Sequence, residues 1–208
     1  MELKKLEVTA FADLLASDAP APGGGSTAAL EGALGAALTA MVCGLTVGKA
    51  KYAASQELVE SVREKCAALQ VRFLDVMDRD TEAFNAVAAA FALPKGTEEE
   101  KAARSKAIQA ALRGCIDTPM EMMELAAETL ELTESLLGRF NDSAASDLGV
   151  AALSLRSAIQ GAWLNVRINI SSIKDQDLAE RSRERGEALL AKALPAADRI
   201  YNAVLEMM

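Results

Sequence analysis

The chain has 208 residues, a formal net charge of −8 and no histidine, and 51% of its residues are hydrophobic. This length supports one sizeable hydrophobic core, whereas the negative charge and the lack of a basic cluster argue against nucleic acid as a partner. Because histidine is missing, the usual proton shuttle and the commonest metal ligand are excluded, and any acid–base chemistry must use other groups.

The first elements are a short helix over about residues 9–16 and a turn over residues 18–26, whose prolines and glycines cannot continue that helix. Ser26 is then expected to be the N-cap of a second helix that runs to about Gly48. Small residues recur on one face of this second helix at four-residue intervals, which lets another backbone approach closely. They are Ala28, Gly32, Ala36, Ala40, Gly44 and Gly48. Glu31 and the many small residues keep the hydropathy low, so no membrane span is expected.

A very long third helix is predicted over about residues 55–93, and Pro94 ends it. Thr97 and Glu100 form the pattern of a capping box, which predicts the start of a fourth helix that ends near Cys115.

Thr118 and Pro119 are expected to open a fifth helix, which Gly138 closes. A loop over residues 139–143 precedes a helix over about residues 144–172.

Asp177 and Glu180 predict the start of the last helix, which Pro195 should kink or divide. Strand signals are almost absent and no linker interrupts the series, so residues 1–208 are expected to form one all-α domain. An antiparallel bundle of about six or seven helices is the simplest architecture.

The three cysteines are widely spaced and odd in number, which fits neither a disulfide framework nor a metal site. Cys43, Cys66 and Cys115 all lie within an apolar helical pattern, so we expect reduced core residues. The first 15 residues carry mixed charges instead of the order of a signal peptide, and we therefore expect a cytoplasmic protein.

The first candidate site is the triglycine turn formed by Gly23, Gly24 and Gly25, directly before the second helix. Glycine lets backbone N–H groups approach a ligand, and a helix N-terminus favours anionic or oxygen-rich groups. The turn lacks the lysine and hydroxyl ending of a phosphate-binding P-loop. A mobile turn without a ligand remains the alternative.

The second candidate is Asp80, which lies on an otherwise apolar stripe of the third helix. The stripe consists of Leu69, Phe73, Val76, Asp80, Phe84, Val87 and Phe91. Burial would raise the pKa of this carboxyl and suit it to exchange protons or to bind a polar heterocycle. An internal salt bridge, or a less buried helix, is the structural alternative.

The third candidate is the region around Asn141 and one small, polar face of the following helix. That face carries Asp147, Ala151, Ser154, Ala158, Gly161, Asn165 and Asn169. It suits either a ligand groove or a hydrogen-bonded contact between helices. Lys51 could meet an anionic part of a substrate or be simply solvated.

Several motifs occur in order along most of the chain. The first are residues 21–30 (APGGGSTAAL), 32–42 (GALGAALTAMV) and 45–52 (LTVGKAKY), and they are followed by residues 80–84 (DTEAF), 93–95, 146–147 and 165–170 (NVRINI). Together they resemble the cyclodeaminase/cyclohydrolase family, which comprises the C-terminal domain of formiminotransferase-cyclodeaminase and free-standing methenyltetrahydrofolate cyclohydrolases.

The resemblance implies an all-helical homodimer that binds a tetrahydrofolate derivative in a groove, with no metal and no cofactor beyond this substrate. It assigns Asp80 as the acid–base or pterin-orienting group. It also implies substrate contacts from the triglycine turn and Ser26, and from Lys51 to the anionic part of the substrate. Less direct groove candidates are Asn141, Ser146, Asp147, Asn165 and Asn169.

Three functions remain open from the sequence. The leading one is hydrolysis of 5,10-methenyltetrahydrofolate to 10-formyltetrahydrofolate, and the second is release of ammonia from 5-formiminotetrahydrofolate. Both pass through a tetrahedral carbon and need positioning and proton transfer, which carboxylate, amide and backbone groups can supply. The third is a catalytically silent scaffold that uses the small-residue helix for self-association.

Overall fold

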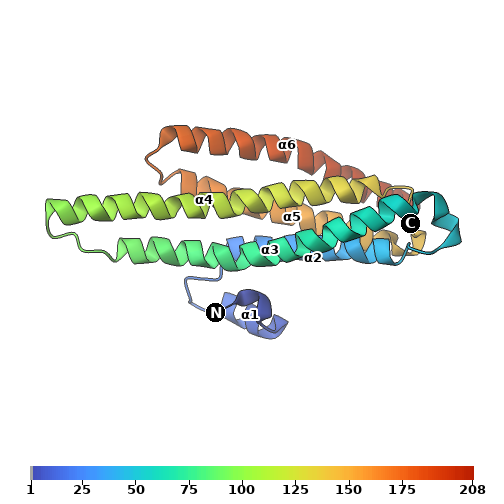
Figure 1. The fold of residues 1–208 in the computed structure, drawn as a ribbon, viewed down its shortest axis with the longest axis horizontal. Coiled ribbons are helices and arrows are strands. Elements are labelled where there is room, and N and C mark those ends of the chain that lie inside the picture. Colours follow the sequence, from blue (N-terminus) through green and yellow to red (C-terminus); the bar gives the residue numbers. More distant parts are fainter. Residues whose placement is uncertain (1) are drawn as a thin grey trace.

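Six α-helices carry most of residues 2–208, the part of the chain that the computed structural model describes (Figure 1). They are α1 Val8–Leu15, α2 Gly24–Gly44, α3 Gln56–Phe91, α4 Glu98–Ser135, α5 Ala145–Ile170 and α6 Gln176–Met207. Short 3-10 helices occupy Leu3–Lys5, Ala50–Ser55 and Asp142–Ala144, and no strand occurs between residues 2 and 208. The predicted all-α bundle of about six or seven helices is therefore confirmed, with six.

Helix α2 lies between α3 and α5, and α4 and α6 complete the bundle around them (Figure 1). The small residues of α2 allow this position, because the neighbouring side chains occupy the space that a larger residue would need. A Cβ atom added at Gly32 would lie 2.6 Å from Phe73 Cδ1 on α3, and one at Gly35 would lie 2.6 Å from Leu155 Cγ on α5. The close approach predicted from the small-residue face is thus observed at Gly32, and Gly35, which was not part of that prediction, allows a second close approach toward α5.

Of the helices in residues 2–208, only α2 is long and apolar enough to cross a membrane. Half of its most apolar stretch is buried inside the bundle. Core helices of soluble proteins have the same length and composition, so this property by itself is weak evidence for a membrane span.

Helix α4 corrects one prediction, because it runs without a break through Pro119 instead of ending near Cys115 and restarting at Thr118. A proline has no N–H, so Pro119 leaves the carbonyl of Cys115, four residues earlier, without its helical partner. Asn169 of α5 supplies the missing donor, and its Nδ2 lies 2.9 Å from the Cys115 oxygen. Helix α6 likewise continues through Pro195 and is not divided there.

The starts of two helices test the capping predictions. Thr97 and Glu100 do form a capping box, in which the Glu100 N–H donates to Thr97 Oγ1 at 3.2 Å and the Thr97 N–H donates to Glu100 Oε2 at 3.1 Å. The predicted cap of the last helix is wrong by two residues. Asp175 is the N-cap, and it accepts a hydrogen bond from the Leu178 N–H at 3.0 Å.

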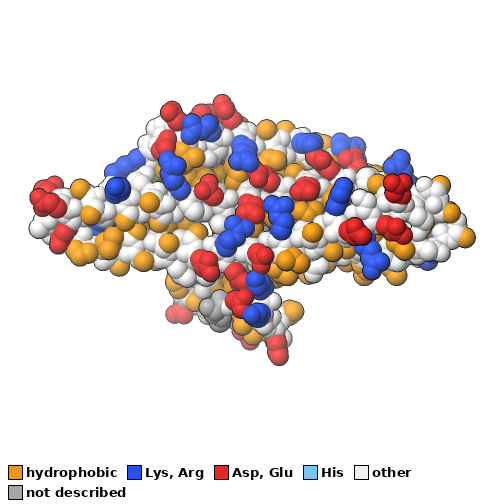
Figure 2. All heavy atoms as spheres, in the orientation of Figure 1, with side chains coloured by type: hydrophobic (Ala, Val, Ile, Leu, Met, Phe, Trp, Pro, Cys, Tyr) orange, Lys and Arg blue, Asp and Glu red, His pale blue; other side chains and the backbone are white. Residues whose placement is uncertain are grey.

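On the face in Figure 2, basic and acidic side chains alternate, and α6 is joined to α4 by the ion pairs Arg185–Glu124 and Lys192–Glu131.

The hairpin of α3 and α4 projects beyond the turn between α5 and α6 (Figure 1). A cavity at this end of the bundle can therefore continue along the projecting hairpin.

Candidate functional site

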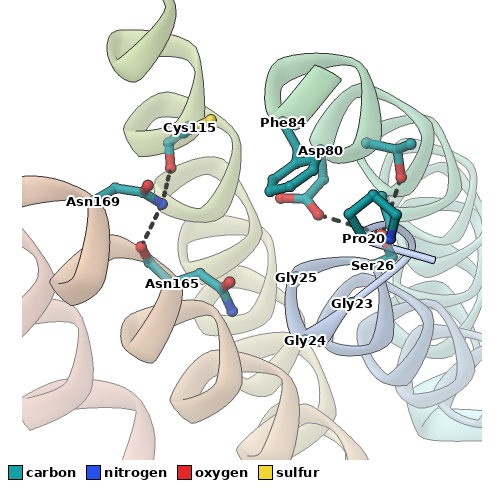
Figure 3. A pocket seen from close by; sticks show the side chains of 12 residues that line it. Pro20, Gly23, Gly24, Gly25, Ser26, Asp80, Phe84, Cys115, Asn165 and Asn169 are labelled. Carbon is teal, nitrogen blue, oxygen red and sulfur yellow. Dashed lines mark hydrogen bonds between the residues drawn. The ribbon is translucent and has the colours of Figure 1, made fainter. Parts of the chain in front are cut away.

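A cavity of about 220 Å³ lies where the start of α2 meets α3, α4 and the end of α5 (Figure 3). Its lining consists of Pro20, Ala21, Gly23, Gly24, Gly25, Ser26, Asp80, Thr81, Phe84, Cys115, Asn165 and Asn169. The cavity therefore unites the triglycine turn, the acid of the third helix and two amides of the polar α5 face. These three regions are far apart in sequence.

The triglycine turn lies directly against the carboxyl group of Asp80. Gly23 is the N-cap of α2, and Gly24 and Gly25 form the first turn of the helix. A Cβ atom at Gly25 would lie 2.7 Å from Asp80 Cγ, so a side chain at this position would displace the carboxyl group. The first N–H groups of a helix have no partner within it, and the helix dipole there favours negative charge. The turn is thus suited to bind a carboxylate or an oxygen-rich ligand.

Ser26 corrects the predicted cap, because it lies inside the first turn of α2 and its side chain is fully buried. Its Oγ donates to Asp80 Oδ2 at 3.3 Å and lies 3.3 Å from Thr81 Oγ1. Ser26 therefore connects the triglycine turn to the acid. Thr81 was missed by the sequence reasoning, although its position next to Asp80 on the same helix was an available signal.

Asp80 is half-buried and has no basic side chain within 4.0 Å among the described residues. Burial raises the pKa of its carboxyl, and the hydrogen bond from Ser26 opposes this rise. The alternative of an internal salt bridge does not hold here. A carboxyl with a raised pKa beside a cavity is better suited to take up and return a proton than an exposed aspartate is.

Asn165 and Asn169 face Asp80 from the opposite wall (Figure 3). Asn169 Nδ2 donates to the carbonyl oxygens of Cys115 at 2.9 Å and Asn165 at 2.8 Å, and Asn165 Nδ2 donates to the Gly161 oxygen at 2.9 Å. These bonds hold both side chains in place, and they use both N–H groups of Asn169 and one of the two of Asn165. The two amide oxygens receive no hydrogen bond within residues 2–208, so they remain available as acceptors for N–H groups of a ligand.

Cys115 also lines the cavity, but burial and, to a smaller extent, the Asp80 carboxylate raise the pKa of its thiol to about 11. The thiol is therefore protonated at neutral pH and is a poor nucleophile. Cys43 and Cys66 are buried and unpaired, as predicted. Between residues 2 and 208, no three His, Cys, Asp or Glu side chains are grouped so that they could hold a metal ion.

The other sequence candidates lie near the opposite end of α2. Lys51 forms an ion pair with Asp142, and its Nζ lies 5.2 Å from the centre of the Tyr52 ring. The Asn141 N–H donates to Thr46 Oγ1 at 2.9 Å. Since the 21 residues of α2 span about 30 Å, this end is remote from the triglycine turn.

Ser146 and Asp147 are at that same remote end, in the first turn of α5. Ser146 is exposed and Asp147 is half-buried. A single subunit therefore brings six of the predicted substrate contacts to the cavity and leaves out Lys51, Asn141, Ser146 and Asp147. A role of these four in substrate binding stays a prediction.

Residues 7–188 match the formiminotransferase-cyclodeaminase family. The methenyltetrahydrofolate cyclohydrolase of Methylorubrum extorquens is 42% identical over 197 residues, which cover 95% of both chains. The formimidoyltransferase-cyclodeaminase of Rattus norvegicus is 34% identical over 184 residues, which cover 88% of this chain but 34% of the rat protein.

A solved structure gives the same result for the fold. The formiminotetrahydrofolate cyclodeaminase of Thermotoga maritima superimposes with a TM-score of 0.89 at 27% sequence identity. The superposition covers 99% of each chain, so every helix described above is included in the likeness.

Proposed function

The chain belongs to the formiminotransferase-cyclodeaminase family, and from this premise we propose that it is a methenyltetrahydrofolate cyclohydrolase, which converts 5,10-methenyltetrahydrofolate and water into 10-formyltetrahydrofolate. The similarity to the Methylorubrum extorquens cyclohydrolase extends over 95% of both chains and favours this reaction. The observation that carries the proposal is the placement of the half-buried Asp80 carboxyl against the triglycine turn, on the wall of a cavity.

In the proposed mechanism, a water molecule attacks the cationic carbon that bridges N5 and N10 of the substrate. The Asp80 carboxylate accepts one proton of this water as the new C–O bond forms, which gives a neutral tetrahedral adduct. The bond from this carbon to N5 then breaks, N5 takes the proton from Asp80, and the hydroxyl proton passes to solvent as the formyl group forms on N10. One proton is released in total, and the step needs no metal or redox cofactor.

The other residues of the cavity position the substrate. The oxygens of Asn165 and Asn169 can accept hydrogen bonds from the N–H groups of a pterin, while the side chain of Phe84 offers an apolar contact beside Asp80. The first turn of α2 supplies backbone N–H groups to oxygen atoms of the substrate or of the tetrahedral adduct. The Ser26 hydroxyl orients the Asp80 carboxylate toward the cavity, with 3.3 Å between Ser26 Oγ and Asp80 Oδ2.

The test is the rate at which purified protein removes 5,10-methenyltetrahydrofolate in a buffer without amines, compared with the spontaneous rate. We expect acceleration and the formation of 10-formyltetrahydrofolate. No acceleration, together with no binding of the substrate, would leave the catalytically silent scaffold as the better explanation.

A second candidate is the cyclodeaminase reaction, in which N10 attacks the formimino carbon and ammonia leaves. The Thermotoga maritima protein that carries this name has the same fold over 99% of both chains, and Asp80 could transfer the required protons in this reaction as well. Assays of both substrates with the same protein preparation separate the two. We expect the larger kcat/KM for hydrolysis, and a larger value for ammonia release would reverse the assignment.

We also infer a homodimer that pairs the exposed sides of α2 and α5. Apolar side chains accumulate there, and large exposed apolar patches mark interfaces. They are Leu34, Met41, Leu45, Val150, Leu153, Leu164 and Ile168. The substitution Leu164→Glu, at a side chain that is 70% exposed, should yield a monomer, whereas Val71→Glu on α3, at 58%, should not. Light scattering of the wild-type chain would contradict the inference if it gave the mass of one subunit.

A further inference from the structure

A second groove lies beside the cavity, at the end of the bundle where the α3–α4 hairpin projects. Its volume is about 420 Å³, and its lining consists of Lys95, Lys101, Arg104, Ser105, Ile108, Gln109 and Lys174. Four of these seven side chains are basic and none is acidic, in a chain whose net charge is −8. Positive charge concentrated in a groove of an acidic protein favours an anionic ligand.

Three of the four basic groups have no carboxylate within 4.0 Å among residues 2–208. Lys174 Nζ donates to Ser105 Oγ at 2.8 Å, and Arg104 donates through Nε and Nη2 to the Phe91 carbonyl at 3.1 and 3.0 Å. The structure records no acidic partner for Lys95, whereas Lys101 pairs with Glu98 at 2.7 Å. Lys95, Arg104 and Lys174 therefore retain the capacity to bind an external carboxylate.

The groove continues the walls of the substrate cavity. On α4, Ile108 and Arg104 lie 7 and 11 positions before Cys115 of the cavity, on the same face of the helix. On α3, Phe91 follows Phe84 of the cavity by two turns and carries Arg104 on its ring, with 5.4 Å from the guanidinium carbon to the ring centre.

The third wall comes from the end of α5. Asn169 of the cavity is followed by the turn that bears Lys174, and Gln109 of α4 holds this turn at both sides. The Gln109 side chain donates to the Ser172 carbonyl at 3.2 Å and accepts from the Lys174 N–H at 2.6 Å. All three walls thus lead from the cavity to the basic groove.

We propose that this groove binds the glutamate carboxylates at the far end of the folate substrate. The inference rests on the proposed function, since a pterin in the cavity would direct the benzoyl group and the glutamate outward along α4. The rise of the helix between Cys115 and Arg104 is about 17 Å, which is comparable to the extended arm of a folate. Each additional γ-linked glutamate adds a carboxylate that can reach Lys95 or Lys174.

This assignment replaces Lys51 as the partner of the anionic part of the substrate. Lys51 is already paired with Asp142 and lies at the other end of α2. In contrast, Lys95 and Lys174 have no carboxylate partner within residues 2–208, and they line a groove on the same face of α4 as the cavity that contains Asp80.

The experiment compares two substrates in the wild-type protein and in the double variant Lys95→Gln/Lys174→Gln. One substrate is a methenyl derivative with three γ-linked glutamates, and the other is the methenyl pteroate, which lacks glutamate. Arg104 is left unchanged because it also binds the end of α3. Lys65→Gln on α3 is the matched control, because Lys65 is exposed and has no ion pair in the described part of the chain. Thermal unfolding verifies that all variants are folded.

We expect the double variant to raise KM for the triglutamate about tenfold, as two partly solvated charge contacts are lost, with kcat within about twofold of wild type. KM for the pteroate and both parameters of Lys65→Gln should not change. Salt should weaken binding of the triglutamate more than binding of the pteroate.

A wild-type protein that hydrolyses both substrates with the same KM would overturn the groove assignment and leave the proposed function intact. The same holds if the double variant raises KM equally for the two substrates. A wild-type protein that turns over neither substrate would instead overturn the proposed function, and the groove assignment with it.

Discussion

The two ends of α2 carry similar residue types but differ in what their polar groups contact. At the Gly24 end, Asp80 has one hydroxyl partner, and the oxygens of Asn165 and Asn169 have none in the described part of the chain. At the Gly44 end, Asp142 is paired with Lys51.

The amide of Asn141 illustrates the same contrast. Its Nδ2 donates to the Leu45 carbonyl at 3.3 Å, and its Oδ1 accepts from the Ser143 N–H at 3.3 Å. Lys51, Asn141 and Asp142 thus have partners within the chain, whereas Asp80 and the oxygens of the cavity asparagines retain free capacity. Unused hydrogen-bonding capacity beside a cavity, more than polarity itself, therefore distinguishes a ligand site from a structural contact.

The largest expected effect is on kcat, in a comparison of Asp80 and Asp142, the acids at the two ends of α2. Asp80→Asn should lower kcat by about 10²–10⁴-fold, because the amide cannot accept the proton of the attacking water. Since burial raises the pKa of Asp80, the charged form costs stability at neutral pH, and the neutral variant should unfold at the same temperature or higher. Asp142→Asn should keep kcat within about twofold, as an exposed ion pair contributes little. Steady-state kinetics and thermal unfolding measure both.

Equal losses of kcat in Asp80→Asn and Asp142→Asn would contradict the distinction between the two ends of α2. They would mean that a second subunit brings the Lys51 end of α2 to the cavity of its neighbour. Full activity of Asp80→Asn would remove Asp80 from the mechanism.

The next effect concerns the glycines of the turn. Gly25→Ala should lower kcat/KM by about 10–100-fold, because the new Cβ would displace the Asp80 carboxyl and a displacement of this size is costly in catalysis. Gly23→Ala is the matched control, since no atom lies within 4 Å of its added Cβ. Both variants are compared by kcat/KM on the same substrate. Identical behaviour of the two would show that the contact with Asp80 does not matter.

A smaller effect is expected from the two asparagines that bind backbone groups. Asn169→Ala leaves the Cys115 carbonyl without a donor, and Asn141→Ala leaves the Leu45 carbonyl without one, so each should cost about 1–3 kcal/mol in the free energy of unfolding. Only Asn169→Ala should also reduce kcat/KM, by about tenfold. Denaturant unfolding and kinetics together separate these outcomes. A loss of activity that simply follows the loss of stability in both variants would contradict a substrate contact from Asn169.

The smallest effect is a shift in pH dependence. The Ser26 hydroxyl stabilises the Asp80 carboxylate, so Ser26→Ala should raise the pKa of Asp80 further. A general base acts in its ionised form, and a higher pKa leaves more of it protonated at a given acidic pH. The acid limb of kcat/KM should therefore move to higher pH, with little change where Asp80 is fully ionised. If the acid limb of kcat/KM stays at the same pH in Ser26→Ala, a group other than Asp80 controls the pH dependence.

Much of the fold could be predicted because local rules decide it. Apolar spacing and the Thr97 capping box correctly predicted α3 and the start of α4. The break predicted at Pro119 was wrong because its remedy, the Asn169 side chain, lies 50 positions along the chain. Local patterns do not contain such a partner.

The site was predicted only in part for the same reason. The triglycine turn and Asp80 were recognisable individually, and the structure brings them into contact. Ser26 looked like a cap, although its partner is an acid 54 positions away. Lys51 was expected at the cavity because it follows α2 closely in the sequence. The sequence pattern does not show that the whole length of α2 separates Lys51 from the triglycine turn.

Pro119 of α4 lies outside the cavity but affects the orientation of Asn169, which lines it. Pro119 keeps the Cys115 carbonyl free to hold the Asn169 amide. Any other residue at this position would offer an N–H that competes for the same oxygen, and the amide could then rotate and present a donor instead of an acceptor to the ligand. A change of substrate preference among relatives of this chain could thus arise at a position that no ligand ever touches.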